Sequence, residues 1–179
     1  AAGAAVVLTA GLIGSGKFVS FTENLLYQDS ILFVRQSKYQ RIVVTKWHND
    51  VRLYIDGGLQ FSSIDEHRYH EALIHPAVSA VPGAQRVLIL GGGDGMAARE
   101  LLKYPHIQRI DLVDLDTEMI GLFRDRPFLA DLSGHSLSDP RVHVHIEDAG
   151  RFLERSPESW DLIFLDLPDP NKLELARLY

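Results

Sequence analysis

Two carboxylates lie close together near the end of the sequence, in the run Asp166-Leu167-Pro168-Asp169-Pro170. They directly follow the apolar segment 162–165, which is typical of a strand buried on both faces. Neighbouring carboxylates raise each other's pKa and attract ammonium groups, so the pair suits a base that takes a proton from an amine. A solvated acidic turn is the alternative, because Asp-Pro is a common turn dipeptide. Their place at the carboxyl end of a predicted strand favours the catalytic interpretation.

A second chemical signal is the loop Gly91-Gly92-Gly93-Asp94-Gly95, which follows the apolar run 87–90. Glycines allow positive φ angles and let the backbone approach a ligand closely. The first strand-to-helix turn of a doubly wound sheet is where nucleotides bind. Asp94 would repel a pyrophosphate, and the spacing is not that of a dinucleotide loop. The loop therefore suits a cationic nucleoside, such as a sulfonium, better than NAD.

Acidic residues also follow the next two predicted strands. Asp114 lies in the second strand, 110–115, at the point where ribose hydroxyls are bound in nucleoside-binding α/β folds. Asp148 and Ala149 follow the third strand, 142–146, where they could reach an adenine amino group. The alternative is that these acids cap helices. Acids in register after successive strands favour a nucleoside site.

Strands that alternate with helices position these groups. The pattern predicts an α/β, methyltransferase-like (Rossmann-like) doubly wound sheet over residues 65–179, preceded by a small antiparallel β subdomain over residues 27–64. In the subdomain we expect strands at 31–34, 41–45 and 51–55, and in the sheet at 87–90, 110–115, 142–146 and 162–165. Helices are expected from residue 65 to about residue 81, and at 96–102, 118–124 and 151–155.

Composition narrows the function further. The 179 residues carry a net charge of −6, so nucleic acid is not an expected partner, whereas a cationic substrate is compatible. There is no cysteine, which excludes disulfides and thiolate chemistry. Residues 1–26 begin with an apolar stretch that is shorter than the roughly 20 residues needed to cross a bilayer. Two interpretations of this stretch remain open: a buried arm, and the end of a membrane segment.

Five motifs together resemble the polyamine aminopropyltransferase (spermidine synthase) family. They are Tyr39-Gln40-Arg41-Ile42, Asp56-Gly57-Gly58-Leu59-Gln60, Asp65-Glu66-His67-Arg68-Tyr69-His70-Glu71, the glycine loop with Arg99-Glu100, and Asp166-Leu167-Pro168-Asp169-Pro170. The resemblance implies transfer of the aminopropyl group of decarboxylated S-adenosylmethionine to a diamine such as putrescine, which gives spermidine and methylthioadenosine. It implies no metal, no tightly bound cofactor and a homodimer.

The resemblance also implies roles for individual residues. Asp166 would be the catalytic base. The residues that would hold the nucleoside co-substrate are Gln40, Gly91, Gly93, Asp94, Gly95, Asp114, Asp148 and Ala149. The residues that would line the polyamine channel are Gln60, Asp65, Tyr69, His70 and Asp169.

Two departures from the usual family pattern carry expectations of their own. Leu167-Pro168 resembles a subgroup with an N-terminal membrane region, which implies a cytoplasmic catalytic domain tethered to the cell membrane. Family members also continue beyond the position of Tyr179, so the second domain is expected to be C-terminally incomplete. Two other functions stay open: an S-adenosylmethionine-dependent amine N-methyltransferase, and a non-catalytic polyamine- or nucleoside-binding domain.

Overall fold

The computed structural model describes residue 27 and residues 29–168, and the chain forms two compact units. Of the described residues, the first unit contains 27, 29–35 and 41–62, and the second contains 36–40 and 63–168. The predictions for residues 1–26 and for Asp169 lie outside the described residues. Among the described residues, no helix is both long enough and apolar enough to cross a bilayer.

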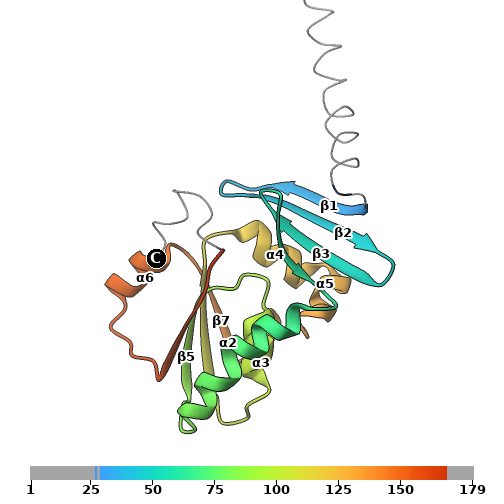
Figure 1. The fold of residues 1–179 in the computed structure, drawn as a ribbon. Helices are drawn as coiled ribbons and strands as arrows, with labels where there is room; N and C mark the ends of the chain where they lie inside the picture. The colour runs from blue at the N-terminus through green and yellow to red at the C-terminus, as the bar shows by residue number, and fades with distance from the viewer. Residues whose placement is uncertain (1–26, 28, 169–179) are drawn as a thin grey trace, which may run out of the picture. The chain divides into compact units, whose positions relative to one another are not determined.

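The first unit is an antiparallel sheet with the strand order β1-β2-β3-β4 (Figure 1). Its strands are β1 Ser30–Gln36, β2 Arg41–Trp47, β3 Asp50–Ile55 and β4 Gly58–Ser62. Asp56 and Gly57 turn the chain between β3 and β4 with φ angles of 50° and 84°. The three predicted strands are confirmed, and β4 is an addition. Its residues Gly58 and Gln60 have low β-propensity, and pairing with β3 overrides that preference.

The second unit is built on a parallel sheet with the strand order β7-β6-β5-β8. Its strands are β5 Arg86–Gly91, β6 Arg109–Asp114, β7 Val142–Ile146 and β8 Leu162–Asp166. Its helices are α2 Glu66–Ala80, α3 Met96–Leu102, α4 Thr117–Asp125, α5 Pro127–Leu132 and α6 Ala149–Arg155, with a short 3₁₀ helix at Ser136–Ser138. The predicted α/β fold is confirmed. The helix α5 and the 3₁₀ helix were not predicted, because each is too short to show a helical period.

Strand order explains where a ligand can bind. From β5 the chain moves outward through β6 to β7, and then returns to place β8 on the other side of β5. This reversal is a topological switch point, and ligands of such sheets bind beyond the carboxyl ends of the strands there. Gly91 pairs with Asp166 at the ends of β5 and β8, and Asp114 ends β6 at the same edge.

The core of the second unit explains the stability of this edge. Residues 87–89 of β5 are fully buried, and the helix α2 buries Ile74 and Val78, which lie one turn apart. From α3, Ala97, Ala98 and Leu101 are also fully buried. The helices α2 and α3 pack on each other (Figure 1). Small residues on α3 allow this close packing.

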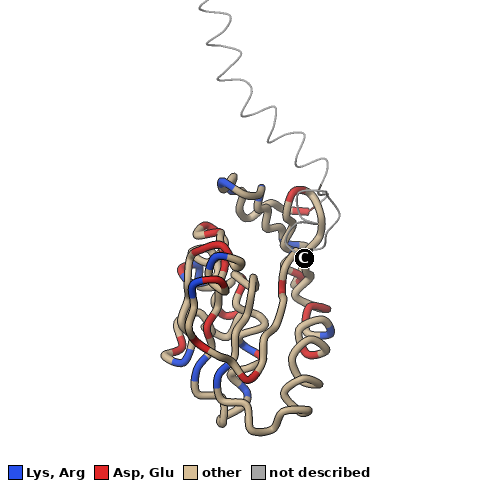
Figure 2. The backbone as a smooth tube through the Cα atoms, turned by 90° about the vertical axis from the view of Figure 1, so that its left-hand side faces the viewer, with Lys and Arg blue, Asp and Glu red and all other residues tan. Residues whose placement is uncertain are grey.

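Charged residues are distributed along the backbone of the second unit. Figure 2 shows Asp and Glu interspersed with Lys and Arg along the tube. Several of these acids have a cationic partner, such as Asp111, which pairs with Arg109 over 2.8 Å, and Asp139, which pairs with Arg141 over 3.3 Å. Such pairs balance charge locally, so a place where carboxylates gather beside one another is chemically informative.

Candidate active site

The main chain fixes the position of Asp166 relative to the glycine loop. The Gly92 N–H donates a hydrogen bond of 2.9 Å to the Asp166 carbonyl oxygen. Gly91 has a φ angle of 87°, and a Cβ atom there would lie 2.1 Å from that same carbonyl oxygen. Only glycine fits at this position, so the sequence of the loop directly allows the close approach of β8.

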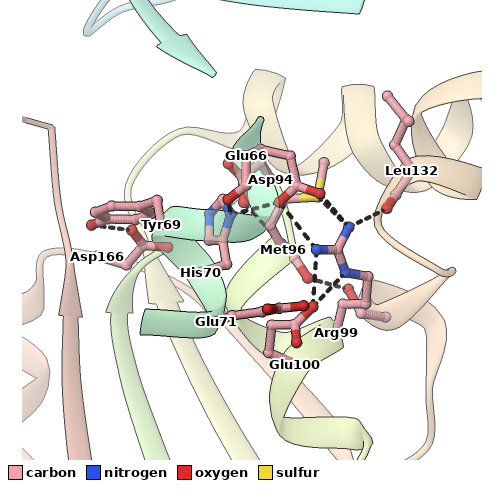
Figure 3. Close-up of polar contacts among 12 residues, drawn as sticks. Glu66, Tyr69, His70, Glu71, Asp94, Met96, Arg99, Glu100, Leu132 and Asp166 are labelled. Carbon is pink, nitrogen blue, oxygen red and sulfur yellow. Dashed lines mark hydrogen bonds and ion pairs between the residues drawn. The ribbon is translucent and has the colours of Figure 1, made fainter. Parts of the chain in front are cut away.

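The side chain of Asp166 is suited to accept a proton. Its Oδ1 accepts a hydrogen bond of 3.0 Å from the Tyr69 hydroxyl (Figure 3). Its Oδ2 is buried and has no hydrogen-bond partner among the described residues. Burial, together with the negative charge of Asp94, raises the pKa of Asp166 to about 6. A carboxylate with a pKa near neutrality and an unpaired oxygen is what a general base requires.

Asp166 shares a small cluster with Asp94 and His70. One ring nitrogen of His70 and one oxygen from each carboxylate all lie within 4.8 Å of one another. Asp94 Oδ1 accepts a hydrogen bond of 2.9 Å from the Met96 N–H, and burial raises the pKa of Asp94. Two carboxylates that converge in this way attract a cation. An organic ammonium group fits this description.

His70 is held from the side of α2 and α3. It is 3 % exposed, and its Nδ1 lies 2.8 Å from Glu66 Oε2. Arg99 donates to both oxygens of Glu66, over 2.8 and 3.0 Å (Figure 3). Burial alone would raise the pKa of Glu66, but the hydrogen bonds from His70 and Arg99 lower it to about 2. Glu66 is therefore a fixed negative charge beside His70.

Asp114 faces the glycine loop. Its two oxygens accept hydrogen bonds from the Gly93 N–H at 2.9 Å and from the Asp116 N–H at 2.8 Å. Burial raises the pKa of Asp114 to about 6. A carboxylate has about four lone-pair sites, so these two bonds leave acceptor capacity for ribose hydroxyls. A Cβ atom at Gly93 would lie 2.7 Å from Asp114 Oδ2, so a side chain there would have to displace the Asp114 carboxylate.

Gln40 lies beside Asp116, for which the sequence indicated no role. Gln40 Nε2 donates to Asp116 Oδ2 over 2.8 Å, and Ser37 Oγ donates to the same oxygen over 2.7 Å. Asp116 Oδ1 accepts from the Glu118 N–H at 3.0 Å and so caps α4. Gln40 thus has a protein partner, and its contact with a nucleoside stays a prediction.

Asp148 caps a helix. Its side chain accepts a hydrogen bond of 2.9 Å from the Arg151 N–H and caps α6. Ala149 packs against the apolar cluster that includes Leu88 and Val113. Gly95, with a φ angle of 77°, begins α3 and its carbonyl oxygen accepts a hydrogen bond of 2.6 Å from Ser136 Oγ. The nucleoside contacts of these residues stay predictions.

The predicted substrate residues differ in their surroundings. Asp65 is exposed at the start of α2 and pairs with Arg68 over 3.0 Å. Gln60 is an exposed residue of β4 in the first unit, and Asp169 lies outside the described residues. Tyr69 contacts Asp166 directly, and His70 belongs to the cluster.

Three contacting residues were not given a role from the sequence. Glu66 and Arg99 lie within the quoted motifs, and Asp116 follows Asp114 by two residues. The spacing of Glu66 and His70 by four residues on one helix was a usable signal, because such pairs share a helix face. The contact of Arg99 with Glu66 spans 33 residues and leaves no trace in local spacing.

The parallel sheet, its glycine loop and the acids at its carboxyl edge define a Rossmann-like α/β domain, a class of fold in which ligands commonly bind at this edge. The model of the spermine/spermidine synthase domain matches residues 66–178. The chain therefore belongs to the spermine/spermidine synthase family.

Relatives and solved structures agree with this membership. The chain is 49% identical over 172 residues to polyamine aminopropyltransferase 2 of Ralstonia nicotianae, covering 96% of this chain and 34% of the relative. It is 51% identical over 157 residues to the polyamine aminopropyltransferase of Mycobacterium tuberculosis, covering 86% of this chain and 29% of the relative. The chain thus spans 34% or less of the length of these two curated relatives.

Two spermidine synthase structures share the fold. One, in complex with the transition state analogue AdoDATO, has a TM-score of 0.74 and 29% identity, covering 79% of this chain and 48% of that chain. The spermidine synthase from Thermotoga maritima has a TM-score of 0.71 and 28% identity, covering 76% of this chain and 48% of that chain. Both structures overlap more than three quarters of this chain.

Proposed function

We propose that this chain forms the nucleoside-binding and catalytic part of a polyamine aminopropyltransferase. It would transfer the aminopropyl group of decarboxylated S-adenosylmethionine to a diamine such as putrescine, giving spermidine and methylthioadenosine. The observation that carries the proposal is Asp166, whose Oδ2 is buried and lacks a hydrogen-bond partner among the described residues. The names of the relatives, polyamine aminopropyltransferases, support the same activity.

The chemistry starts with a proton transfer. An ammonium group has no lone pair, so Asp166 takes a proton from the acceptor nitrogen before or during attack. The nitrogen lone pair then forms a bond to the propyl carbon attached to sulfur. The carbon–sulfur bond breaks, its electron pair goes to sulfur, and neutral methylthioadenosine leaves. The positive charge of the sulfonium ends on the new secondary ammonium group.

Positioning accounts for most of the remaining barrier, because the sulfonium is already an activated leaving group. Asp94 would bind the ammonium end of the aminopropyl group, since its oxygen lies within 4.8 Å of an oxygen of Asp166. Asp114, at the end of β6, would accept hydrogen bonds from ribose hydroxyls. Gln40, Asp148 and Ala149 would complete the nucleoside site, next to Gly91, Gly93 and Gly95 of the loop.

The acceptor amine would occupy a channel lined by acidic and aromatic side chains. Tyr69 and His70 would lie at the reacting end, beside Asp166. The other residues proposed for the channel are Gln60, Asp65 and Asp169. Carboxylates along such a channel would bind the distant ammonium group of a diamine and so set the acceptor length.

An amine N-methyltransferase is the alternative function. Intact S-adenosylmethionine carries a carboxylate that the decarboxylated form lacks. Asp94 and Asp166 would repel that carboxylate in the cluster they form with His70. The acidic cluster therefore favours the decarboxylated co-substrate.

Calorimetric binding of decarboxylated S-adenosylmethionine, intact S-adenosylmethionine and methylthioadenosine to the chain tests this proposal. We expect at least a tenfold preference for the decarboxylated form or methylthioadenosine over the intact form, equivalent to about 1.4 kcal/mol. A preference for intact S-adenosylmethionine would instead support the methyltransferase. Product analysis with putrescine, agmatine, cadaverine and spermidine would then identify the acceptor.

The homodimer and the membrane attachment implied by the resemblance also stay predictions. Light scattering tests the first, because a dimer has twice the 20.1 kDa mass of the chain. Flotation of the chain with lipid vesicles tests the second. A monomeric mass would contradict the first expectation, and a failure to float would show that residues 1–26 do not bind lipid by themselves.

A further inference from the structure

Three carboxylates surround the imidazole of His70, and they come from three different elements. Glu66 lies on α2, Asp94 lies in the loop after β5, and Asp166 ends β8 (Figure 3). The ring is 3 % exposed, so water screens these charges poorly. Tyr69 adds a neutral aromatic contact, with ring centroids 5.0 Å apart.

Glu66 makes the shortest of these contacts. Its Oε2 lies 2.8 Å from His70 Nδ1, and its carbonyl oxygen lies 3.0 Å from the same nitrogen. Both of these partners are acceptors, so Nδ1 carries a hydrogen. Burial on its own would lower the pKa of His70, but the bond to Glu66 and the charges of Asp94 and Asp166 raise it.

Arg99 prevents Glu66 from moving away. Its guanidinium donates to both oxygens of Glu66, and it also donates to the Leu132 carbonyl oxygen over 2.8 Å and pairs with Glu100 over 2.9 Å. A forked, bidentate arginine contact fixes both distance and orientation. Glu66 is thus held as a charged group by a residue outside the acidic cluster.

We propose that Glu66, held by Arg99, is a positioning residue that keeps His70 as an imidazolium beside Asp94 and Asp166. The imidazolium offsets the repulsion between these two carboxylates and so favours the ionised form of each. Asp166 can then act as a base while Asp94 binds an ammonium group. Where it concerns catalysis, this inference rests on the proposed aminopropyl transfer.

The charge of His70 can be measured without any substrate. In a chain labelled with ¹⁵N-histidine, the two ring nitrogens report protonation as the pH is varied, and His70→Gln identifies the signals of His70. We expect the titration midpoint of His70 in the unmodified chain to lie above that of an ordinary histidine, which titrates near pH 6.5. A neutral His70 at pH 6.5 would overturn the proposal, and this result needs no further variant.

Substitution of Glu66 then tests the cause. Glu66→Gln keeps the shape of the side chain and removes its charge, so the titration midpoint of His70 should fall by about one pH unit or more. Glu66→Asp keeps the charge and should retain part of the effect. Glu71→Gln is the matched control, because Glu71 is an exposed carboxylate on the same helix, outside the cluster. An unchanged midpoint in a folded Glu66→Gln chain would overturn the proposal.

Kinetics provide the second readout. When His70 loses its charge, Asp166 holds its proton more tightly. In Glu66→Gln the acidic limb of kcat/KM should therefore move to higher pH, and a movement by one pH unit lowers kcat/KM at pH 6 up to about tenfold. A uniform loss at every pH would indicate a structural effect and would contradict the inference. If the chain transfers no aminopropyl group while His70 titrates as expected, only the proposed function fails.

Discussion

The hydroxyl of Tyr69 donates a hydrogen bond of 3.0 Å to Asp166 Oδ1, although the two residues are 97 positions apart in the sequence. The bond favours the ionised form of Asp166 and so opposes burial and the charge of Asp94, which raise its pKa. It engages one oxygen and leaves Oδ2 for a proton. Tyr69 therefore adjusts the strength of the base as well as its orientation.

Tyr69→Phe removes this hydrogen bond and keeps the ring. The pKa of Asp166 should rise, and the acidic limb of kcat/KM should move up by roughly 0.5 to 1 pH unit. The measurement is kcat/KM between about pH 5 and 9, which brackets the expected limb. Tyr104→Phe is the matched control, because Tyr104 bonds to His75 and not to the cluster. An identical shift in both variants would argue against a direct effect.

Asp166→Asn removes the base and nearly preserves the shape of the side chain. We expect kcat to fall by about 10²- to 10⁴-fold, the usual contribution of a positioned base. Methylthioadenosine, which carries no amine to deprotonate, should bind with an affinity within about threefold of the original, or roughly 0.7 kcal/mol. Activity and calorimetry test these two statements separately. An Asp166→Asn chain that retained full turnover would show that another group removes the proton.

The same variant should be more stable than the original chain at neutral pH. The pKa of Asp166 is raised from 3.8 to about 6, so the folded state binds more protons than the unfolded state within this interval. Stability therefore falls as pH rises from about 4 through 6. The Asp166→Asn chain does not lose this stability, because asparagine does not ionise. Two pH units correspond to about 2.7 kcal/mol, and coupling to Asp94 and His70 makes roughly 1–2 kcal/mol the expected gain.

Urea unfolding at about pH 4.5 and about pH 7.5 measures this gain. The added stability of the Asp166→Asn chain should be present at the higher pH and small at the lower pH, because Asp166 is protonated in the folded state at the lower pH. Asp125→Asn is the control, since Asp125 is an exposed residue of α4. A gain of equal size at both pH values would mean that ionisation is not its cause.

Gly91→Ala should destabilise the second unit severely. Its Cβ atom would lie 2.1 Å from the Asp166 carbonyl oxygen, at a φ angle of 87°. Neither atom can move without breaking the pairing of β5 and β8, so we expect a loss above about 4 kcal/mol, or no folding. Gly57→Ala is the comparison, because Gly57 also has a positive φ angle, 84°, but nothing lies within 4 Å of its added Cβ atom.

Thermal unfolding followed by circular dichroism distinguishes these two substitutions. Gly57→Ala should lower the stability by only about 1 kcal/mol, the usual strain of a non-glycine residue in this conformation. Similar losses in both chains would show that close approach of β8 is not what requires glycine at position 91.

Most of the fold could be predicted from local patterns. The helix α3 begins and ends where its sequence indicated, because the left-handed Gly95 precedes it and a regular apolar face continues to Leu102. The strand β7 also has its predicted bounds. In contrast, α5 begins at Pro127, a common helix-start residue, but six residues are too few to show a period.

The sequence predicted those parts of the candidate site that lie at the ends of strands. Asp94 and Asp166 meet because parallel strands end at one edge of the sheet, and Tyr69 and His70 were indicated by the family motif. The anchoring of His70 was not predicted in full, because Arg99 reaches Glu66 across 33 residues. Asp148 caps a helix, as a polar residue after a strand often does, and its contact with a nucleoside stays a prediction.

The hydrogen bond that fixes Asp166 beside the glycine loop joins backbone atoms, the Gly92 N–H and the Asp166 carbonyl oxygen, at the paired ends of β5 and β8. Substitutions of other side chains around Asp166 can therefore alter the size and charge of the site without displacing the base from the loop. An evolutionary lineage, or a protein engineer, could exchange one acceptor amine for another by changing side chains while the reacting geometry is inherited intact.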